Sequence, residues 1–205
     1  EILIGLVGSE MCIRDRYHWK IYVVGSVEYQ YPNHLFQAGY FLDKKYYDEN
    51  TIDFKHLLLS EKNQSLLKDI QNSNSVGVHI RRGDYMTKQN LVIFGNICTQ
   101  KYYHDAIRII TEKVNDAVFY VFSDDISWVQ THLDIPNAVY VNWNTGESSI
   151  YDMYLMSSCK YNIIANSTFS YWAARLNKKT NMVIYPSKWY NTFTPDIFPE
   201  SWCGI

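Results

Sequence analysis

Hydrophobic residues between Ser75 and Tyr185 form short apolar runs that alternate with stretches of helical spacing. Short runs rich in β-branched and aromatic residues, bounded by polar residues, are typical of buried strands. Apolar residues three or four positions apart predict amphipathic helices. The predicted strands are Val76–Ile80, Val118–Phe122, Val139–Asn142, Tyr161–Ala165 and Met182–Tyr185. The predicted helices are Thr99–Val114, Ser127–Leu133, Ser148–Cys159 and Phe169–Leu176.

This alternation predicts an α/β fold in which right-handed crossovers build a parallel sheet covered by helices. Ligands of such sheets bind outside the carboxyl ends of the strands. We therefore expect the chemistry of this chain in the loops after Ile80, Phe122, Ala165 and Tyr185.

The pattern is weaker toward the N-terminus. Phe54–Asn72 carries a helical pattern that is broken in the middle, and Asp43–Asn50 is polar and predicts a loop. Glu1–Arg16 has no clear period, and its part from Leu6 onward resembles the translation of a sequencing adapter. We expect residues 1–16 to be non-native and the true N-terminus to be missing. The predicted division is 1–16, 17–72 and 73–205.

Composition excludes several classes of protein. The 205 residues include 19 Lys and Arg against 21 Asp and Glu, a net charge of -2, which excludes a basic nucleic-acid binder. No apolar run approaches the roughly 18 residues that a membrane-spanning helix needs. Outside residues 1–16 the cysteines are Cys98, Cys159 and Cys203, whose wide spacing fits neither a metal motif nor a disulfide framework.

The strongest candidate for chemistry is the segment from His79 to Asp84, which follows a predicted buried strand. Arg81 and Arg82 are adjacent, so on an extended chain they point in different directions. A guanidinium in a crevice can grip a phosphate or carboxylate with two hydrogen bonds, and Asp84 can orient it by pairing. The alternative is a surface ion pair in an ordinary loop.

Two further strand ends carry polar side chains. Ser123-Asp124-Asp125 could accept hydrogen bonds from a base or ribose; alternatively, Ser123 or Asp124 caps the following helix, and both roles can hold together. Asn166-Ser167-Thr168 opens a helix whose N–H groups can bind an anion, and here too a plain helix cap is the alternative. Because each of the three motifs follows a predicted strand, together they favour a site for a nucleoside diphosphate.

The segments VGVHIRRGDY, VFSDD, DMYLMSSCKYNIIANSTFSYWAARLN and IYPSKWY resemble, in order and spacing, the bacterial-type α-1,2-fucosyltransferases of glycosyltransferase family 11. The resemblance begins near Phe36. It implies a GT-B-type α/β fold, with a Rossmann-like, parallel-sheet donor domain at 73–205. Residues 17–72 would be the remnant of a truncated N-terminal acceptor domain and its linker. The Gly-rich first turn of that domain has no match here.

The family transfers L-fucose from GDP-β-L-fucose to O2 of a galactose in a glycan, with inversion. The resemblance therefore implies GDP-fucose as donor and a β-galactoside glycan as acceptor. It implies no metal, no cofactor and no nucleic acid. For a bacterial source the expected location is the cytoplasm or the periphery of the cytoplasmic membrane.

The resemblance also implies roles for individual residues. Arg81 would grip the diphosphate while Arg82 and Asp84 support its loop, and His79 would approach the nucleoside or the fucose. The implied catalytic residues are thus Arg81, His79 and Asp84, and the implied donor-binding residues are Arg81, Arg82, Asp124, Asp125, Asn166, Ser167, Thr168 and Phe169. Asp124 and Asp125 would read guanine or ribose, residues 167–169 would hold phosphate and flank the base, and Asp152 and Asn166 would support that loop.

Several alternatives stay open. No carboxylate is assigned as the general base. The chain could bind the donor without transferring the sugar, because much of the acceptor domain is expected to be missing. Two other functions fit part of the pattern: a non-catalytic carbohydrate-binding module, which leaves Arg81 unexplained, and a transferase that uses a UDP- or ADP-sugar.

Overall fold

The computed structural model describes residues 27–31, 34–38 and 54–205. The predicted non-native segment 1–16 and the predicted loop 43–50 lie outside the described residues. Strands β1 (Val27–Tyr31) and β2 (His34–Ala38) pair in antiparallel fashion, with Val27 opposite Ala38 and Tyr31 opposite His34.

The remaining strands form one parallel sheet in the order β5-β4-β3-β6-β7-β8. Counted from β3, this is the order third, second, first, fourth, fifth, sixth, the doubly wound arrangement of Rossmann-like folds. The strands are β3 (Asn74–Ile80), β4 (Ala117–Ser123), β5 (Ala138–Val141), β6 (Tyr161–Ile163), β7 (Met182–Tyr185) and β8 (Cys203–Gly204). The five predicted strands are confirmed, and β8 is an addition at the edge of the sheet.

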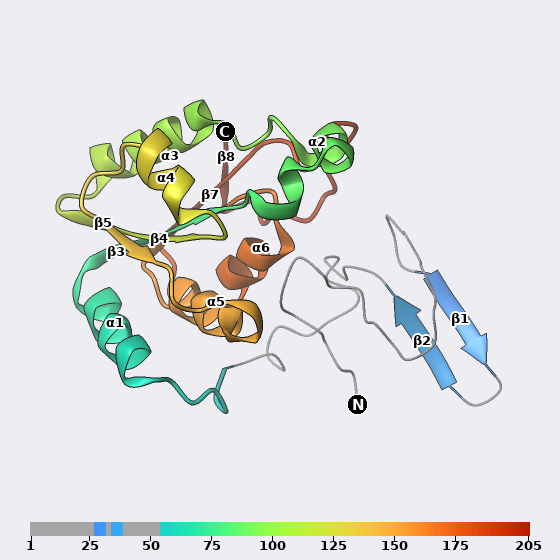
Figure 1. The fold of residues 1–205 in the computed structure, drawn as a ribbon, viewed down its shortest axis with the longest axis horizontal. Helices are drawn as coiled ribbons and strands as arrows, with labels where there is room; N and C mark the ends of the chain where they lie inside the picture. The colour runs from blue at the N-terminus through green and yellow to red at the C-terminus, as the bar shows by residue number, and fades with distance from the viewer. Residues whose placement is uncertain (1–26, 32–33, 39–53) are drawn as a thin grey trace.

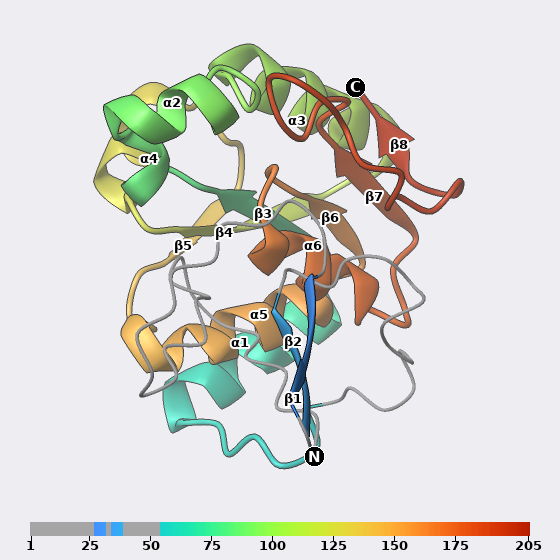
Figure 2. The ribbon, with the colours of Figure 1, turned by 90° about the vertical axis from the view of Figure 1, so that its right-hand side faces the viewer.

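Helices cover both faces of this sheet (Figures 1 and 2). Helices α3 (Gln100–Lys113) and α4 (Ile126–His132) lie on one face. Helices α1 (Glu61–Asn72), α5 (Ser149–Ser157) and α6 (Thr168–Arg175) lie on the other. The short helix α2 (Lys88–Phe94) follows a 3-10 turn at Gly83–Met86, and a second 3-10 turn spans Gly146–Ser148.

The alternation of side chains along β3 explains the two layers. Val76, Val78 and Ile80 belong to the core under α3, whereas Phe122 of β4, the register partner of His79, belongs to the core under α5 and α6. Because both faces are covered, β3 is buried almost throughout. This is the reason that its sequence is a continuous apolar run rather than an alternating one.

One predicted helix differs from the structure in its bounds, and one helix of the structure was not predicted. The helix predicted from the Phe54–Asn72 pattern begins only at Glu61, because Ser60 caps it by accepting a hydrogen bond from the backbone N–H of Asn63. Helix α2 was not predicted, since its apolar residues are consecutive and Val92 is exposed. Its signals are local ones: Thr87 caps its start by accepting from the N–H of Asn90, and Gly95 follows its end.

Within the described ranges, no helix combines the length and the apolar character needed to cross a membrane.

Candidate functional site

The strand order reverses between β3 and β6, which are neighbours in the sheet although strands β4 and β5 lie between them in sequence. At such a switch point the loops after the two strands turn away from each other and leave a crevice at the carboxyl edge. The loop after β3 begins with Arg81, and the loop after β6 leads through Asn166 into α6. Two of the three predicted motifs therefore lie at this switch point, and the third follows the adjacent strand β4.

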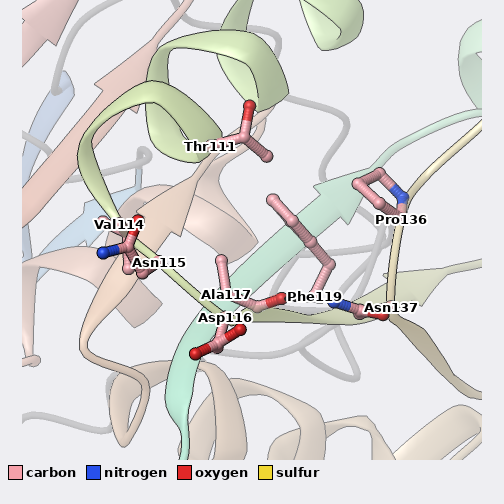
Figure 3. Close-up of a pocket in the computed structure, with 8 residues that line it drawn as sticks. All are labelled: Thr111, Val114, Asn115, Asp116, Ala117, Phe119, Pro136 and Asn137. Carbon is pink, nitrogen blue, oxygen red and sulfur yellow. Dashed lines mark hydrogen bonds between the residues drawn. The ribbon is translucent and has the colours of Figure 1, made fainter.

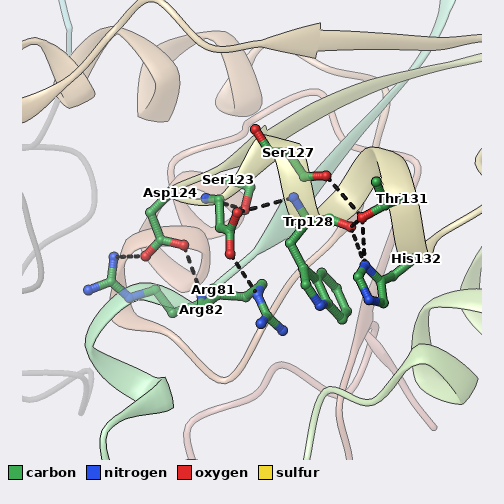
Figure 4. Close-up of polar contacts among 9 residues, drawn as sticks. Arg81, Arg82, Ser123, Asp124, Ser127, Trp128, Thr131 and His132 are labelled. Carbon is green, nitrogen blue, oxygen red and sulfur yellow. Dashed lines mark hydrogen bonds and ion pairs between the residues drawn. The ribbon is translucent and has the colours of Figure 1, made fainter.

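The two arginines do point in different directions, as predicted (Figure 4). The Arg81 guanidinium contacts two carboxylates: Nη2 lies 2.5 Å from Asp84 Oδ1 and Nη1 lies 2.8 Å from Asp124 Oδ2. Arg82 turns toward α4, where its Nε donates to Asp125 Oδ2 at 3.1 Å. The predicted pairing of Asp84 with an arginine is confirmed.

In the Ser123-Asp124-Asp125 segment, one carboxylate contacts helix α4 and the other contacts the loop after β3. Asp125, rather than Ser123 or Asp124, caps α4, since its Oδ1 accepts from the N–H of Trp128 at 3.1 Å. Ser123 Oγ accepts from the N–H of Asp125 at 3.0 Å. Asp124 faces the loop after β3, where its Oδ1 accepts from the N–H of Arg82 at 2.9 Å. Every carboxylate oxygen of the pair thus has a partner within the protein.

Trp128 is a site residue that the sequence analysis missed. Its indole ring lies under Arg82, with the guanidinium carbon 3.6 Å from the ring centroid. The His132 ring stacks on Trp128 at 4.4 Å between centroids. A cation over an indole face is held by the ring quadrupole, so Arg82 is fixed by an aromatic and a carboxylate together. The signal in the sequence was a tryptophan in the first turn of the helix predicted after Asp125.

Asn166 joins three loops of the carboxyl edge. Its side-chain N–H groups donate to the backbone oxygens of Phe94 at 3.3 Å and Trp189 at 3.0 Å. Its Oδ1 accepts from Cys98 Sγ, and its backbone oxygen accepts from the Tyr85 hydroxyl at 2.9 Å. These contacts hold Asn166 against other segments of this edge, and its predicted support of residues 167–169 stays a prediction. The segment Asn166-Ser167-Thr168 matches the N-glycosylation pattern, but this amide is buried and already bonded.

Helix α6 presents a start that no side chain caps. Ser167 is the capping residue by position, yet its side chain makes no capping hydrogen bond. Ser170 Oγ instead accepts from the N–H of Ala165 at 3.2 Å, one turn below. The first N–H groups of a helix lack partners within the helix and carry partial positive charge. The start of α6, with Ser167 and Thr168, can therefore receive an anion at this edge of the sheet.

His79 belongs to β3, and its ring centroid lies 5.0 Å from that of Phe169 in α6. The side chain is 6% exposed, and its buried Nδ1 has no hydrogen-bond partner among the described residues. Burial, and secondarily the Arg81 charge, lowers the pKa of His79 to about 3. The imidazole is therefore neutral at physiological pH, and it offers a ligand a hydrogen bond rather than a charge.

Asp152 differs from its predicted role. Its Oδ1 accepts from Asn144 Nδ2 at 2.6 Å rather than from the loop around Asn166. Asn144 also exchanges hydrogen bonds with Asn63 of α1. Asp152 thus joins α5 to α1 through the segment after β5. Burial raises the pKa of its carboxyl from 3.8 to about 7, against the smaller opposing effect of Asn144.

The hollow drawn in Figure 3 lies at the opposite edge of the sheet. It is lined by the end of α3, the start of β4 and the residues just before β5, including Asp116 and Asn137. Ligands of doubly wound sheets bind at the other edge, so this hollow is separate from the motifs. Among the described ranges, no three His, Cys, Asp or Glu side chains are grouped so that they could hold a metal ion. The expectation that no metal is needed stays a prediction.

Comparison with known proteins gives three kinds of match. The model of Glycosyl transferase family 11 matches residues 13–205. An alpha-1,2-colitosyltransferase of Escherichia coli is 35% identical over 196 residues, 88% of this chain and 63% of that protein. The O-antigen biosynthesis glycosyltransferase WbnK of Escherichia coli is 44% identical over 122 residues, 58% of this chain and 40% of that protein.

More distant relatives include the galactoside alpha-(1,2)-fucosyltransferase 2 of Pongo pygmaeus, 28% identical over 73% of this chain and 48% of that protein. Among solved structures, the fucosyltransferase NodZ from Bradyrhizobium aligns with a TM-score of 0.39 at 18% identity, over 55% of this chain and 39% of that one. That score is too low to support a conclusion about this chain. The chain spans 40% to 63% of the lengths of the three curated relatives named here. The family match begins at residue 13, inside the segment predicted to be non-native, and the origin of residues 1–16 stays a prediction.

Proposed function

Because the chain belongs to glycosyl transferase family 11, we propose that it carries the donor site of a transferase that moves L-fucose from GDP-β-L-fucose to O2 of a galactose in a glycan, with inversion. The observation that carries this proposal is the position of Arg81. Its guanidinium lies at the carboxyl end of β3, and the neighbouring strand β6 leads to the uncapped start of α6.

The reaction explains why cationic donors belong at this place. In an inverting transfer the acceptor oxygen forms a bond to C1 of the sugar while the bond from C1 to the β-phosphate oxygen breaks. The electron pair of the broken bond stays on the leaving diphosphate. Arg81 and the N–H groups at the start of α6 are held before the reaction, so they stabilise this charge without reorganising. The neutral His79 can hydrogen-bond to the sugar or nucleoside from the same side of the crevice.

Asp124 and Asp125 support donor binding through the arginines. Asp124 contacts Arg81, and Asp125 contacts Arg82, which in turn rests on Trp128. Ser167, Thr168 and Phe169 are proposed to hold phosphate and to flank the base. The general base that takes the proton of the acceptor hydroxyl is not assigned among these residues.

A second donor sugar is favoured by one observation. The Escherichia coli relative that shares 35% identity over 88% of this chain is described as an alpha-1,2-colitosyltransferase. A transfer assay on the 205-residue chain should therefore offer GDP-fucose and GDP-colitose separately, with a β-galactoside as acceptor. The sugar that is transferred identifies the donor. Transfer of neither sugar by a chain that binds GDP would support the alternative of a donor-binding fragment.

The test of the donor site is calorimetric titration of the chain with GDP, with UDP and ADP as competing nucleotides. Arg81→Ala should weaken GDP binding by roughly 10- to 100-fold, because a hydrogen bond to a charged group contributes about 1.5–3 kcal/mol. Arg108→Ala is the matched control, since Arg108 also contacts two carboxylates but is exposed on α3. It should leave GDP affinity unchanged.

Three results would count against the proposal. Equal losses of affinity in Arg81→Ala and Arg108→Ala would show that Arg81 has no special role. Tighter binding of UDP or ADP than of GDP would favour a transferase with a different donor. Binding of galactosides without any nucleotide would favour the carbohydrate-binding module.

A further inference from the structure

Two carboxylates occupy the Arg81 guanidinium in this structure. Asp84 Oδ1 lies 2.5 Å from Nη2, and Asp124 Oδ2 lies 2.8 Å from Nη1. The Arg81 side chain is 15% exposed, whereas those of Asp84 and Asp124 are 38% and 27% exposed. Both Nη atoms are thus engaged by acidic groups that lie at the protein surface.

Both carboxylate oxygens of Asp124 contact the loop after β3. One of its oxygens contacts Arg81 while the other accepts from the backbone N–H of Arg82. The loop also passes very close to this carboxylate, because a Cβ atom added to Gly83 would lie 2.5 Å from Asp124 Oδ2. Any larger residue at position 83 would have to push Asp124 or the loop aside. Gly83 therefore permits the approach that fixes Arg81 and Arg82.

Asp84 is held in a different way. Among the described residues, its carboxylate contacts Arg81 through one oxygen, from three positions further along the same loop. Its side chain is the more exposed of the two, so it can rotate into solvent without breaking a backbone contact. Asp124 cannot leave Arg81 without also leaving the N–H of Arg82.

The charge of the cluster favours a movement of this kind. Arg81 and Arg82 supply two positive charges, and Asp84, Asp124 and Asp125 supply three negative ones. This net negative cluster repels a diphosphate as long as both carboxylates stay on Arg81. A guanidinium grips phosphate best with two N–H groups, and here each Nη of Arg81 already contacts a carboxylate.

We propose that the two carboxylates have opposite roles: Asp84 occupies the place of a phosphate oxygen on Arg81 and is displaced by the diphosphate, whereas Asp124 stays and positions the arginine. This inference rests on the proposed function, since it takes the diphosphate to be the ligand of Arg81. Asp124 acts through Arg81 and the loop, so it is a positioning residue. The exchange breaks no covalent bond and transfers no proton.

The test compares GDP affinity in Asp84→Asn and Asp124→Asn by calorimetric titration. Asp84→Asn should bind GDP about tenfold more tightly, because the competing charge is gone and the side chain keeps its size. Asp124→Asn should bind about tenfold more weakly, because the guanidinium and the loop lose their anchor. Simple charge repulsion predicts tighter binding in both variants, so the opposite signs distinguish exchange and positioning from repulsion.

Asp105→Asn is the matched control, because Asp105 also contacts an arginine and a lysine but lies on α3, away from the loop. Its GDP affinity should equal that of the unmodified chain. Changes of the same sign in Asp84→Asn and Asp124→Asn would overturn the proposal. So would an affinity of Asp84→Asn equal to or below that of the unmodified chain.

A second measurement tests the positioning role without any nucleotide. Gly83→Ala should lower the midpoint of thermal unfolding, and it should lower it much less in an Asp124→Ala background, where the carboxylate that the new Cβ meets is absent. Equal losses in the two backgrounds would overturn positioning by Asp124. If the unmodified chain binds no GDP at all, the proposed function fails and the exchange at Asp84 fails with it, whereas this coupling is still judged by its own result.

Discussion

Replacement of Asn166 by alanine should lower the free energy of unfolding by about 2–4 kcal/mol. The Asn166 side chain is 2% exposed, and its amide N–H groups donate hydrogen bonds to the backbone oxygens of Phe94 and Trp189. Each of these carbonyls loses its donor in the variant, and a buried unsatisfied polar group costs about 1–3 kcal/mol. Cys98 loses its acceptor as well. The loops after β3, β6 and β7 are then no longer held together by this amide.

Asn191 offers a matched control because it has the same side chain and a similar pair of acceptors. Its amide donates to the backbone oxygens of Val92 at 2.9 Å and Leu91 at 3.4 Å, but it is exposed. Water can replace its hydrogen bonds, so Asn191→Ala should cost about 1 kcal/mol or less.

Urea unfolding followed by circular dichroism measures both variants under the same conditions. For a chain of this size, a loss of 3 kcal/mol corresponds to a fall in melting temperature of roughly 6–12 °C. Equal destabilisation in Asn166→Ala and Asn191→Ala would refute the reasoning, because burial would then have no influence on the cost. A loss below about 0.5 kcal/mol in Asn166→Ala would refute it too, since that is within the range of surface substitutions.

Three further predictions concern buried groups outside this junction. The pKa of Asp152 is raised from 3.8 to about 7, so the contribution of this residue to stability falls as pH rises from about 4 to about 7. In urea unfolding, Asp152→Asn should be more stable than the unmodified chain at pH 8, by at most about 4 kcal/mol. At pH 4 the two proteins should have similar stability. Gly77→Ala should lose about 1–3 kcal/mol by the same measurement, since its Cβ would lie 2.9 Å from Asn162 Nδ2 in the core. Because the pKa of His79 is lowered to about 3, between pH 3 and 6.5 its imidazole is protonated in the unfolded chain but not in the folded one. This residue therefore makes the free energy of unfolding rise with pH over that range. The NMR signals of His79 should show a neutral ring at pH 5.

Each of these predictions can fail on its own. An Asp152→Asn variant that is less stable than the unmodified chain at pH 8 would show that the carboxylate stabilises the fold. A neutral effect of Gly77→Ala would show that the neighbouring side chains can move. Titration of His79 near pH 6.5 would show that its ring is open to water.

Five of the six strands of the parallel sheet and most of its helices could be predicted from the sequence, because their signals are local. A strand buried on both faces is a continuous apolar run, and the end of Val76–Ile80 is marked by the charges that follow it. Helix α2 escaped prediction because its apolar residues do not follow the helical period and Val92 faces solvent. Helix α2 contacts residues far along the chain: Asn191 donates to the backbone oxygen of Val92, and Asn166 donates to that of Phe94.

The sequence alone determined where polar chemistry could occur: at the ends of buried strands, where the chain leaves the core and side chains such as Arg81 and Asn166 become available to a ligand. Only the tertiary structure decided which of these ends meet. Arg81 and Asp124 are 43 positions apart, and they come together because β3 and β4 are parallel neighbours whose carboxyl ends lie at one edge. Asp124 contacts Arg81 whereas Asp125 contacts Arg82 and caps α4, because the two carboxylates point in different directions as the chain leaves β4. Those directions depend on packing across the sheet, which no local pattern in the sequence records.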